Sequence, residues 1–207
     1  MKIAVSGTAA TGKTTLAGRL AQALGLPVID EGYERLFVDP AAYNTGAPQL
    51  AAAMQTVLEE KRAREAAAGG FVADRCPIDL FHLWLGKNLW RMDEDTRRFH
   101  EACRSFTQAY DHVVIPSWGG VPLAQSSEGG AKQRVMNEWV QLRNHAAITG
   151  YAHLWLPADR IIEIPPAVAR LEARVDFVLR AIRAAPSLAP NSAGRRSGPV
   201  ASPAGCA

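Results

Sequence analysis

The segment Gly7–Thr14 reads Gly-Thr-Ala-Ala-Thr-Gly-Lys-Thr. A Gly, four free positions, a second Gly, a Lys and a Ser or Thr form the pattern of a loop that wraps around phosphates. Glycines let backbone N–H groups curl around a phosphate, Lys13 spreads positive charge over its oxygens, and the Thr14 hydroxyl suits Mg²⁺. The pattern predicts a nucleoside triphosphate site between a strand and a helix.

The residues on both sides of this loop fit that order. Residues 1–6 are a short apolar run suited to a buried strand. Leu16, Leu20 and Leu24 then recur at helical spacing. A glycine-rich turn without a ligand is the alternative, and the order of strand, loop and helix argues against it.

Length and composition indicate one domain in a reducing compartment. The chain has 207 residues, enough for one α/β domain with a substantial core. Its net charge of +3 does not call for a nucleic acid or an anionic membrane as partner. The amino terminus enters the first strand without a signal peptide, and no apolar stretch is long enough to cross a bilayer, so we expect a cytoplasmic protein. Three cysteines without a paired spacing, and five histidines without ligand spacing, argue against disulfides and zinc.

The apolar pattern after the first helix alternates between strands and helices. This order predicts an α/β fold, a three-layer P-loop NTPase sandwich with a five-stranded parallel sheet. We expect the charges along 49–68 to lie on a solvated helix face. Beyond the first strand and helix, the expected strands are 28–29, 71–73, 112–116 and 153–156, and the expected helices are 49–68, 78–88, 94–110 and a last one from 168.

The carboxy-terminal residues have a different composition. From about residue 185, prolines lie among Ser, Ala and Gly with almost no large apolar side chain. Such a segment buries too little surface to offset its ordering entropy. We therefore predict a domain at 1–184 and a disordered tail at 185–207.

Charged residues follow the expected strands at the edge where open parallel sheets bind ligands. Asp74 ends a strand that should lie beside the first one, where an acid can hold Mg²⁺ opposite Thr14. Arg75 follows it and suits phosphate oxygens. A surface ion pair, or an acid that caps the next helix, is the alternative for this pair.

Another acidic pair follows the second strand. Glu31 is placed to accept a proton from an acceptor hydroxyl. Asp30 competes for this role, and an ordinary solvated turn acid is a further alternative. After the fourth strand, a polar loop supplies Lys132 and Arg134 as further candidates for nucleotide binding.

On the motifs Gly7–Thr14 and Asp74-Arg75-Cys76, the chain resembles the P-loop small-molecule and nucleoside kinases. Within them it is similar to the branch of nicotinamide riboside kinase domains and AAA-type ATP-binding proteins. The resemblance implies a metal-binding acid at Asp74, a phosphate-binding arginine at Arg75 and a general base at Glu31. It also implies a lid at about 119–134, although this segment holds fewer basic residues than such lids do.

The resemblance further implies that Pro157-Ala158-Asp159 holds the nucleotide base through backbone groups. A helix that carries Arg143 follows the lid, and an exposed helical arginine is usually just solvated. Aromatic residues and a histidine between the second strand and residue 110 could line an acceptor pocket or belong to the core. These residues are Tyr33, Phe37, Tyr43, Phe81, His82 and Trp84.

Two functions are consistent with these patterns. The first is an ATP- and Mg²⁺-dependent phosphotransferase that acts on a hydroxyl of a small molecule, a nucleoside or a nucleotide, in which Lys13, Glu31, Asp74 and Arg75 are catalytic. The second is a nucleotide-binding regulatory module without efficient transfer. No charge run is dense enough for a polynucleotide acceptor. Preference for ATP or GTP, the acceptor and the oligomeric state, a homodimer included, stay open. The residues expected to bind nucleotide are Gly7, Thr8, Ala9, Ala10, Thr11, Gly12, Lys13, Thr14, Thr15, Lys132 and Arg134.

Overall fold

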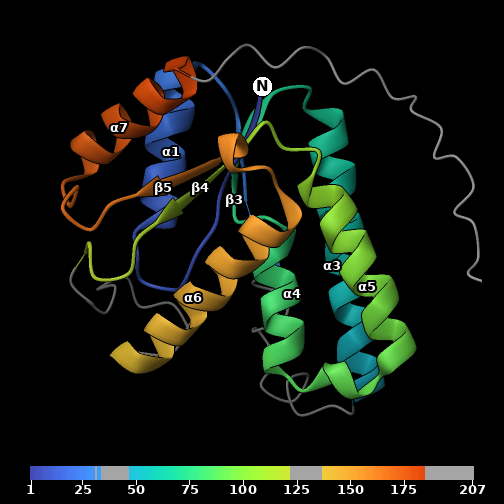
Figure 1. The fold of residues 1–207 in the computed structure, drawn as a ribbon. Coiled ribbons are helices and arrows are strands. Elements are labelled where there is room, and N and C mark those ends of the chain that lie inside the picture. The colour runs from blue at the N-terminus through green and yellow to red at the C-terminus, as the bar shows by residue number, and fades with distance from the viewer. Residues whose placement is uncertain (31, 34–46, 122–136, 185–207) are drawn as a thin grey trace, which may run out of the picture.

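A single parallel sheet forms the centre of the computed structural model, which describes residues 1–30, 32–33, 47–121 and 137–184 (Figure 1). Its strands follow the order β2-β3-β1-β4-β5. The first strand of the chain is therefore central, between β3 and β4. This confirms the predicted α/β class with five parallel strands. The strands are β1 (Lys2–Val5), β2 (Val28–Ile29), β3 (Phe71–Asp74), β4 (His112–Pro116) and β5 (Ile161–Ile164).

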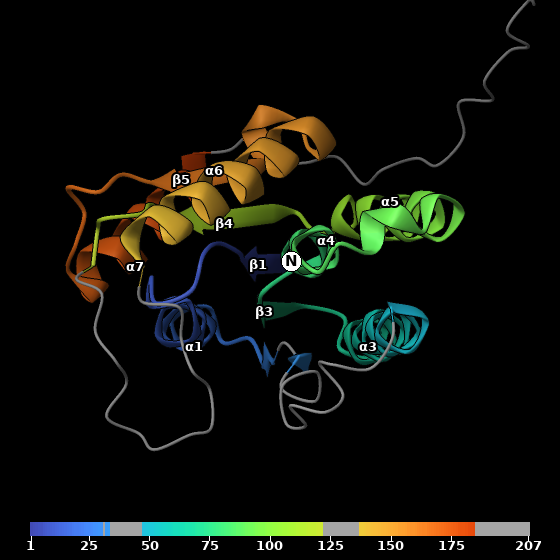
Figure 2. The same cartoon turned by 90° about the horizontal axis from the view of Figure 1, so that it is seen from below.

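Helices cover both faces of this sheet (Figure 2). Two of them, α1 and α7, pack against one face, and the other four described α-helices pack against the opposite face. The result is the predicted three-layer sandwich. The helices are α1 (Lys13–Leu24), α3 (Ala47–Ala67), α4 (Pro77–Gly86), α5 (Asp93–Thr107), α6 (Glu138–Trp155) and α7 (Leu171–Ala184), with short 3-10 turns η2 (Leu89–Arg91) and η3 (Ala158–Arg160).

The central strand shows why the sheet needs helices on both faces. Ile3 and Val5 belong to the cluster beneath α1 and α7, whereas Ala4 belongs to the cluster beneath the other layer. All three side chains are fully buried. Successive side chains of a strand point to opposite faces, so an apolar run of this kind stabilises a sheet only when both faces are covered.

The predicted fifth strand is wrong. Residues 153–155 complete α6 and Leu156 is its C-cap; Ile148, Ala152 and Trp155 are buried and Leu154 is largely exposed. Four apolar residues do not distinguish a strand from the last turn of a helix, and here the helical spacing of the buried residues decides. The actual fifth strand is β5, in which the exposed Glu163 interrupts the isoleucines. The segment 157–159 therefore precedes the last strand, so its expected contact with the nucleotide base loses its structural basis.

The charges predicted to be solvated on α3 are exposed at four positions, Glu59, Glu60, Arg62 and Arg64, but two others need a correction. Lys61 and Glu65 are buried and form an ion pair of 2.8 Å. The phenol of Tyr110 donates a hydrogen bond of 2.8 Å to the same carboxylate. Charges of both signs along a helix do not reveal which of them faces the core, because each pair one turn apart can lie on either side.

Two predicted segments fall mainly outside the described residues. These are the lid, of which the structure describes 119–121, and the whole tail at 185–207. Within the described ranges, no helix is long and apolar enough to span a membrane.

Candidate functional site

The loop between β1 and α1 has the backbone geometry that a phosphate loop requires. Gly7 has a φ of 140° and Gly12 a φ of 74°, values that side chains disfavour. The Lys13 ammonium is buried and donates a hydrogen bond of 2.6 Å to the carbonyl of Thr8. The hydroxyl of Thr11 donates to the same carbonyl at 3.0 Å. The Lys13 side chain thus folds back over the loop and bonds to the loop backbone. In this position the ammonium can contact the oxygens of a bound phosphate.

Pairing of β3 with β1 places the predicted acid beside this loop. Asp74 is the register partner of Val5, the last residue of β1. Asp74 is only 7% exposed, and the Thr14 hydroxyl lies near enough to favour its charged form. Burial raises the pKa of Asp74 above its usual range, and the nearby Lys13 partly opposes this shift.

The pair Asp74 and Thr14 fits a Mg²⁺ ion. One carboxylate oxygen of Asp74, Oδ1, is buried and has no hydrogen-bond partner among the described residues. A buried carboxylate oxygen without a partner is costly, and a hard cation would satisfy it. The structure therefore brings together the two residues that the sequence predicted as metal ligands.

The next residue, Arg75, is held in a strained conformation. Its φ of 71° lies in the left-handed region, which a side chain of this size disfavours. The guanidinium lies 3.4 Å from a carboxylate oxygen of Asp79, with which it forms an ion pair. Neither alternative for this pair fits, because Asp74 is buried, Arg75 forms its ion pair with Asp79, and Cys76 is the residue that caps α4.

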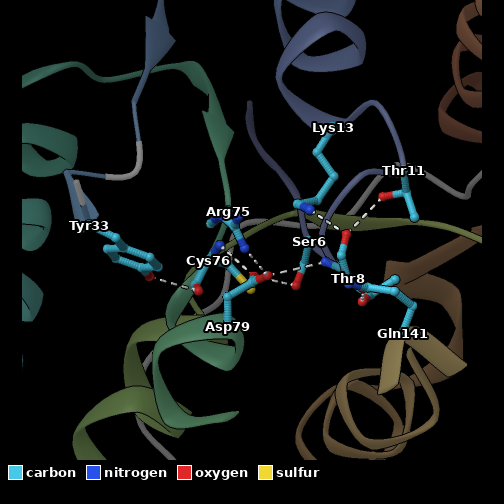
Figure 3. A network of polar contacts seen from close by, with 10 residues as sticks. Ser6, Thr8, Thr11, Lys13, Tyr33, Arg75, Cys76, Asp79 and Gln141 are labelled. Carbon is cyan, nitrogen blue, oxygen red and sulfur yellow. Dashed lines mark hydrogen bonds and ion pairs between the residues drawn. The ribbon is translucent and has the colours of Figure 1, made fainter. Parts of the chain in front are cut away.

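Asp79 is a site residue that sequence reasoning missed. It is the third residue of α4, is 5% exposed, and accepts hydrogen bonds from Ser6, Gly7 and Cys76 in addition to Arg75 (Figure 3). The signal was available. Cys76 and Asp79 stand in the spacing of a capping box, in which an acid three residues on bonds back to the residue before the helix.

Two other helices also bind the phosphate loop, and sequence reasoning missed both contacts. The hydroxyl of Thr8 donates a hydrogen bond to the side-chain carbonyl of Gln141, a fully buried residue of α6. Arg174 of α7 is 4% exposed and donates a hydrogen bond of 2.8 Å to the carbonyl of Thr11. No acid in the described parts of the chain pairs with this guanidinium, and burial lowers its pKa. Periodicity alone would assign both side chains to helix surfaces.

The acidic pair after β2 is only partly described. Asp30 is exposed and forms an ion pair of 2.5 Å with Arg64 of α3. The hydrogen bond with Arg64 lowers the pKa of Asp30. This partner weakens Asp30 as a candidate base. Glu31 lies outside the described residues, as do Lys132 and Arg134.

The aromatic residues considered for an acceptor pocket are core residues where the structure describes them, apart from the half-buried His82. Tyr33 is buried and donates a hydrogen bond of 3.0 Å to the carbonyl of Cys76. Trp84 is fully buried and stacks on Phe99 at 4.2 Å between ring centroids. Phe81 is also buried, and Phe37 and Tyr43 lie outside the described residues. Burial raises the pKa of the Cys76 thiol to about 12, so this sulfur is not a nucleophile.

A cavity of about 280 Å³ adjoins the phosphate loop. Loop residues such as Ala10 form one wall, and Trp118, which follows β4, forms another. The first residue of α6, Glu138, completes the lining. Arg143 of the same helix is exposed and donates a hydrogen bond of 3.5 Å to Asn144, which agrees with a solvated arginine.

Residues 2–156, more than half of the chain, match the family model described as an AAA domain. The chain belongs to this AAA domain family. The match includes the phosphate loop, Asp74 and Asp79, whereas Arg174 lies beyond the matched residues. No curated protein matches the chain.

Solved structures show the same fold. A deoxyadenosine kinase from M. mycoides with the products dCMP and dCDP superposes with a TM-score of 0.61 at 12% identity, over 88% of this chain and 99% of that one. A NadR protein in complex with NR gives a TM-score of 0.61 at 18% identity, over 86% of this chain and 50% of NadR. NadR with NAD and AMP-PNP gives 0.58 at 17% identity, over 86% and 48%. The AAA domain described here thus spans about half the length of NadR and has a P-loop kinase-like fold.

Proposed function

We propose that this AAA domain is an ATP- and Mg²⁺-dependent phosphotransferase that phosphorylates a hydroxyl of a small molecule of the nucleoside class. The observation that carries the proposal is the position of Asp74 and Arg75. Asp74 ends β3 and Arg75 follows it, both beside the phosphate loop, and the Asp74 carboxylate lies near the hydroxyl of Thr14. A loop that only binds a nucleotide does not need an arginine fixed next to its metal acid.

Each candidate site residue that the structure describes has a role in this proposal. The loop amides and Lys13 bind the β- and γ-phosphates, and Arg75 binds the transferred group. Thr14 and Asp74 would hold Mg²⁺, which supplies positive charge to the phosphate oxygens. The cavity beside Ala10 and Trp118 accommodates the nucleoside part of ATP, with the indole ring as a flat wall.

The proposed base is Glu31, which follows β2 in the sequence and lies outside the described residues. Glu31 takes the proton of the acceptor hydroxyl while its oxygen forms a bond to the γ-phosphorus, and the bond from phosphorus to the leaving oxygen of ADP breaks. Lys132 and Arg134 close over the phosphates from the segment 119–134. Support for a nucleoside comes from the fold alone, which is shared with structures of a deoxyadenosine kinase and of NadR with NR.

The competing function is a nucleotide-binding module without transfer, and one experiment separates the two. ADP release from MgATP is measured with a panel of nucleosides, nucleotides and sugars. The proposal predicts that one acceptor class stimulates ADP release and that Lys13→Ala abolishes it. Binding of MgATP without stimulation by any acceptor would identify the module.

The assignment of the base is tested separately. Glu31→Gln is expected to lower kcat by about 10²-fold or more while the affinity for MgATP stays near that of the wild type. Asp30→Asn is the matched control, because this neighbour already has an ionic partner in Arg64. A Glu31→Gln variant with unchanged kcat would exclude Glu31 as the base.

A further inference from the structure

The Asp79 carboxylate accepts four hydrogen bonds, and all of them come from residues just beyond the ends of β1 and β3 (Figure 3). Oδ2 accepts from the hydroxyl of Ser6 at 2.5 Å and from the amide of Cys76 at 3.2 Å. Oδ1 accepts from the amide of Gly7 at 3.2 Å and from the guanidinium of Arg75 at 3.4 Å. The proposed reaction gives this acid no role.

The partners of Asp79 suit a carboxylate and not an amide. Three of the four bonds come from groups that can only donate, two backbone amides and a guanidinium. An amide side chain would have to direct its NH₂ group either at Gly7 and Arg75 or at Ser6 and Cys76, and each choice sets donor against donor. The short bond from Ser6 has the length of a charge-assisted O–H to carboxylate bond.

The two ends that Asp79 joins belong to different halves of the site. Gly7 is the first residue of the loop that binds the nucleotide, and Arg75 is the group proposed to meet the phosphoryl group in transfer. Asp79 itself is buried beneath Gly7 and Arg75. Its negative charge would repel a phosphate that it contacted directly. Its influence on the reaction therefore has to pass through Gly7 and Arg75.

We propose that Asp79 is a positioning residue whose charge fixes the start of the phosphate loop and Arg75 in one geometry, so that nucleotide binding and the placement of Arg75 depend on each other. Arg75 needs such a support, because its left-handed backbone is unfavourable without one. The role assigned to Arg75 rests on the proposed function, whereas the effect on the phosphate loop does not.

Binding of MgATP to the full chain, measured by calorimetry, tests the first half. Asp79→Asn should weaken binding by about tenfold or more, and Ser6→Ala, which keeps the charge and removes one donor, by a smaller factor. Asp93→Asn, an exposed acid in the first turn of α5, is the matched control and should bind MgATP as the wild type does. An Asp79→Asn variant that melts cooperatively and binds MgATP with the wild-type dissociation constant would overturn the proposal.

A double-mutant cycle with Arg75→Ala tests the link between the two halves. If Asp79 acts through Arg75, the double variant should lose less MgATP affinity than the product of the two single losses. Losses that multiply, or an Arg75→Ala variant that binds MgATP like the wild type, would overturn the link. Because the cycle measures binding alone, a failure of the proposed function is separately visible as wild-type protein that binds MgATP but transfers no phosphate to any acceptor.

Discussion

The buried carboxylate of Asp74 is in an environment that disfavours its charge. Burial raises its pKa, and one oxygen lacks a partner among the described residues. An acid whose pKa rises on folding makes its stabilising contribution at low pH, and this contribution is lost as pH rises through the raised value. At neutral pH the ligand-free protein therefore carries an unfavourable charge that a cation would relieve.

Asp74→Asn is expected to stabilise the ligand-free protein and to abolish metal-dependent turnover. Removing a poorly solvated charge should raise Tm by about 2–4 °C, the change that corresponds to about 1 kcal/mol in a domain of this size. Thermal unfolding at pH 7 without Mg²⁺ checks this, with Asp93→Asn as the exposed control. A lower Tm for Asp74→Asn would show that the charge stabilises the fold instead.

The same raised pKa predicts how nucleotide binding depends on pH. As pH falls, the carboxylate of Asp74 should take up a proton above its ordinary value of 3.8, and affinity for MgATP should decrease there. Calorimetric titrations between about pH 4 and 8 measure this decrease. The Asp74→Asn variant cannot titrate at this position, so it shows the pH dependence that comes from ATP itself. The affinities of the wild type and the variant should therefore change differently with pH at the acidic end. Identical profiles would remove Asp74 from the metal site.

Most of the candidate catalytic residues could be predicted, but their supports could not. Asp74 was predictable because parallel pairing puts the last residue of a neighbouring strand beside the phosphate loop. Gln141 and Arg174 were not predictable. A position in a helix indicates which side of the helix a residue occupies, but not which other segment packs against that side. Contacts across more than a hundred residues of sequence leave no local pattern.

At the scale of elements, α3 carries a buried ion pair in addition to its solvated charges. Lys61 and Glu65 lie one turn apart, and Tyr110 adds a hydrogen bond to the carboxylate. Removal of one partner of such a pair leaves the other charged in the core, which costs more than the pair contributes.

Glu65→Ala is therefore expected to lower the free energy of unfolding by about 3–5 kcal/mol. Glu59→Ala, at an exposed position of the same helix, should change it by less than about 0.5 kcal/mol. Urea unfolding measures both. Equal small effects would mean that the Lys61 ammonium reaches water and that the pair is not buried in solution.

The last helix contributes to the nucleotide site through one residue. Arg174 of α7 bonds to the Thr11 carbonyl, and a Cβ at the adjacent Gly12 would lie only 3.1 Å from its guanidinium. Arg174→Ala should weaken MgATP binding by about tenfold, because the loop loses a charge-assisted bond that fixes its shape. Arg180→Ala, an exposed arginine of the same helix, is the control for calorimetry. Equal affinities in the two variants would exclude α7 from the site.

Elements were predicted where strong local signals exist and missed where they do not. Residues 112–116 form the predicted strand because five apolar or buried residues follow a polar turn. Residues 153–156 have a similar composition, yet they form the last residues and the C-cap of α6, because the burial follows a helical period that starts at Ile148. Packing partners decide the structure of both segments. Only 112–116 has a length and boundaries in the sequence that identify it as a strand.

At the scale of the whole molecule, the phosphate loop is where three helices from distant parts of the chain meet. Asp79 of α4, Gln141 of α6 and Arg174 of α7 each bond to the loop or to the residue before it. The loop is therefore fixed before a nucleotide arrives, as expected for a site that stabilises developing charge. Helices on both faces of the sheet supply these bonds, so the three-layer architecture itself supports the proposed transfer.

Transfer of the γ-phosphate from labelled ATP to a nucleoside acceptor tests the central claim most directly. With γ-³²P-labelled MgATP and a nucleoside panel, the wild-type chain should produce a labelled nucleoside phosphate, and Asp74→Ala should produce none. Label found only as free phosphate, at a rate that no acceptor changes, would contradict the claim that this AAA domain is a small-molecule kinase.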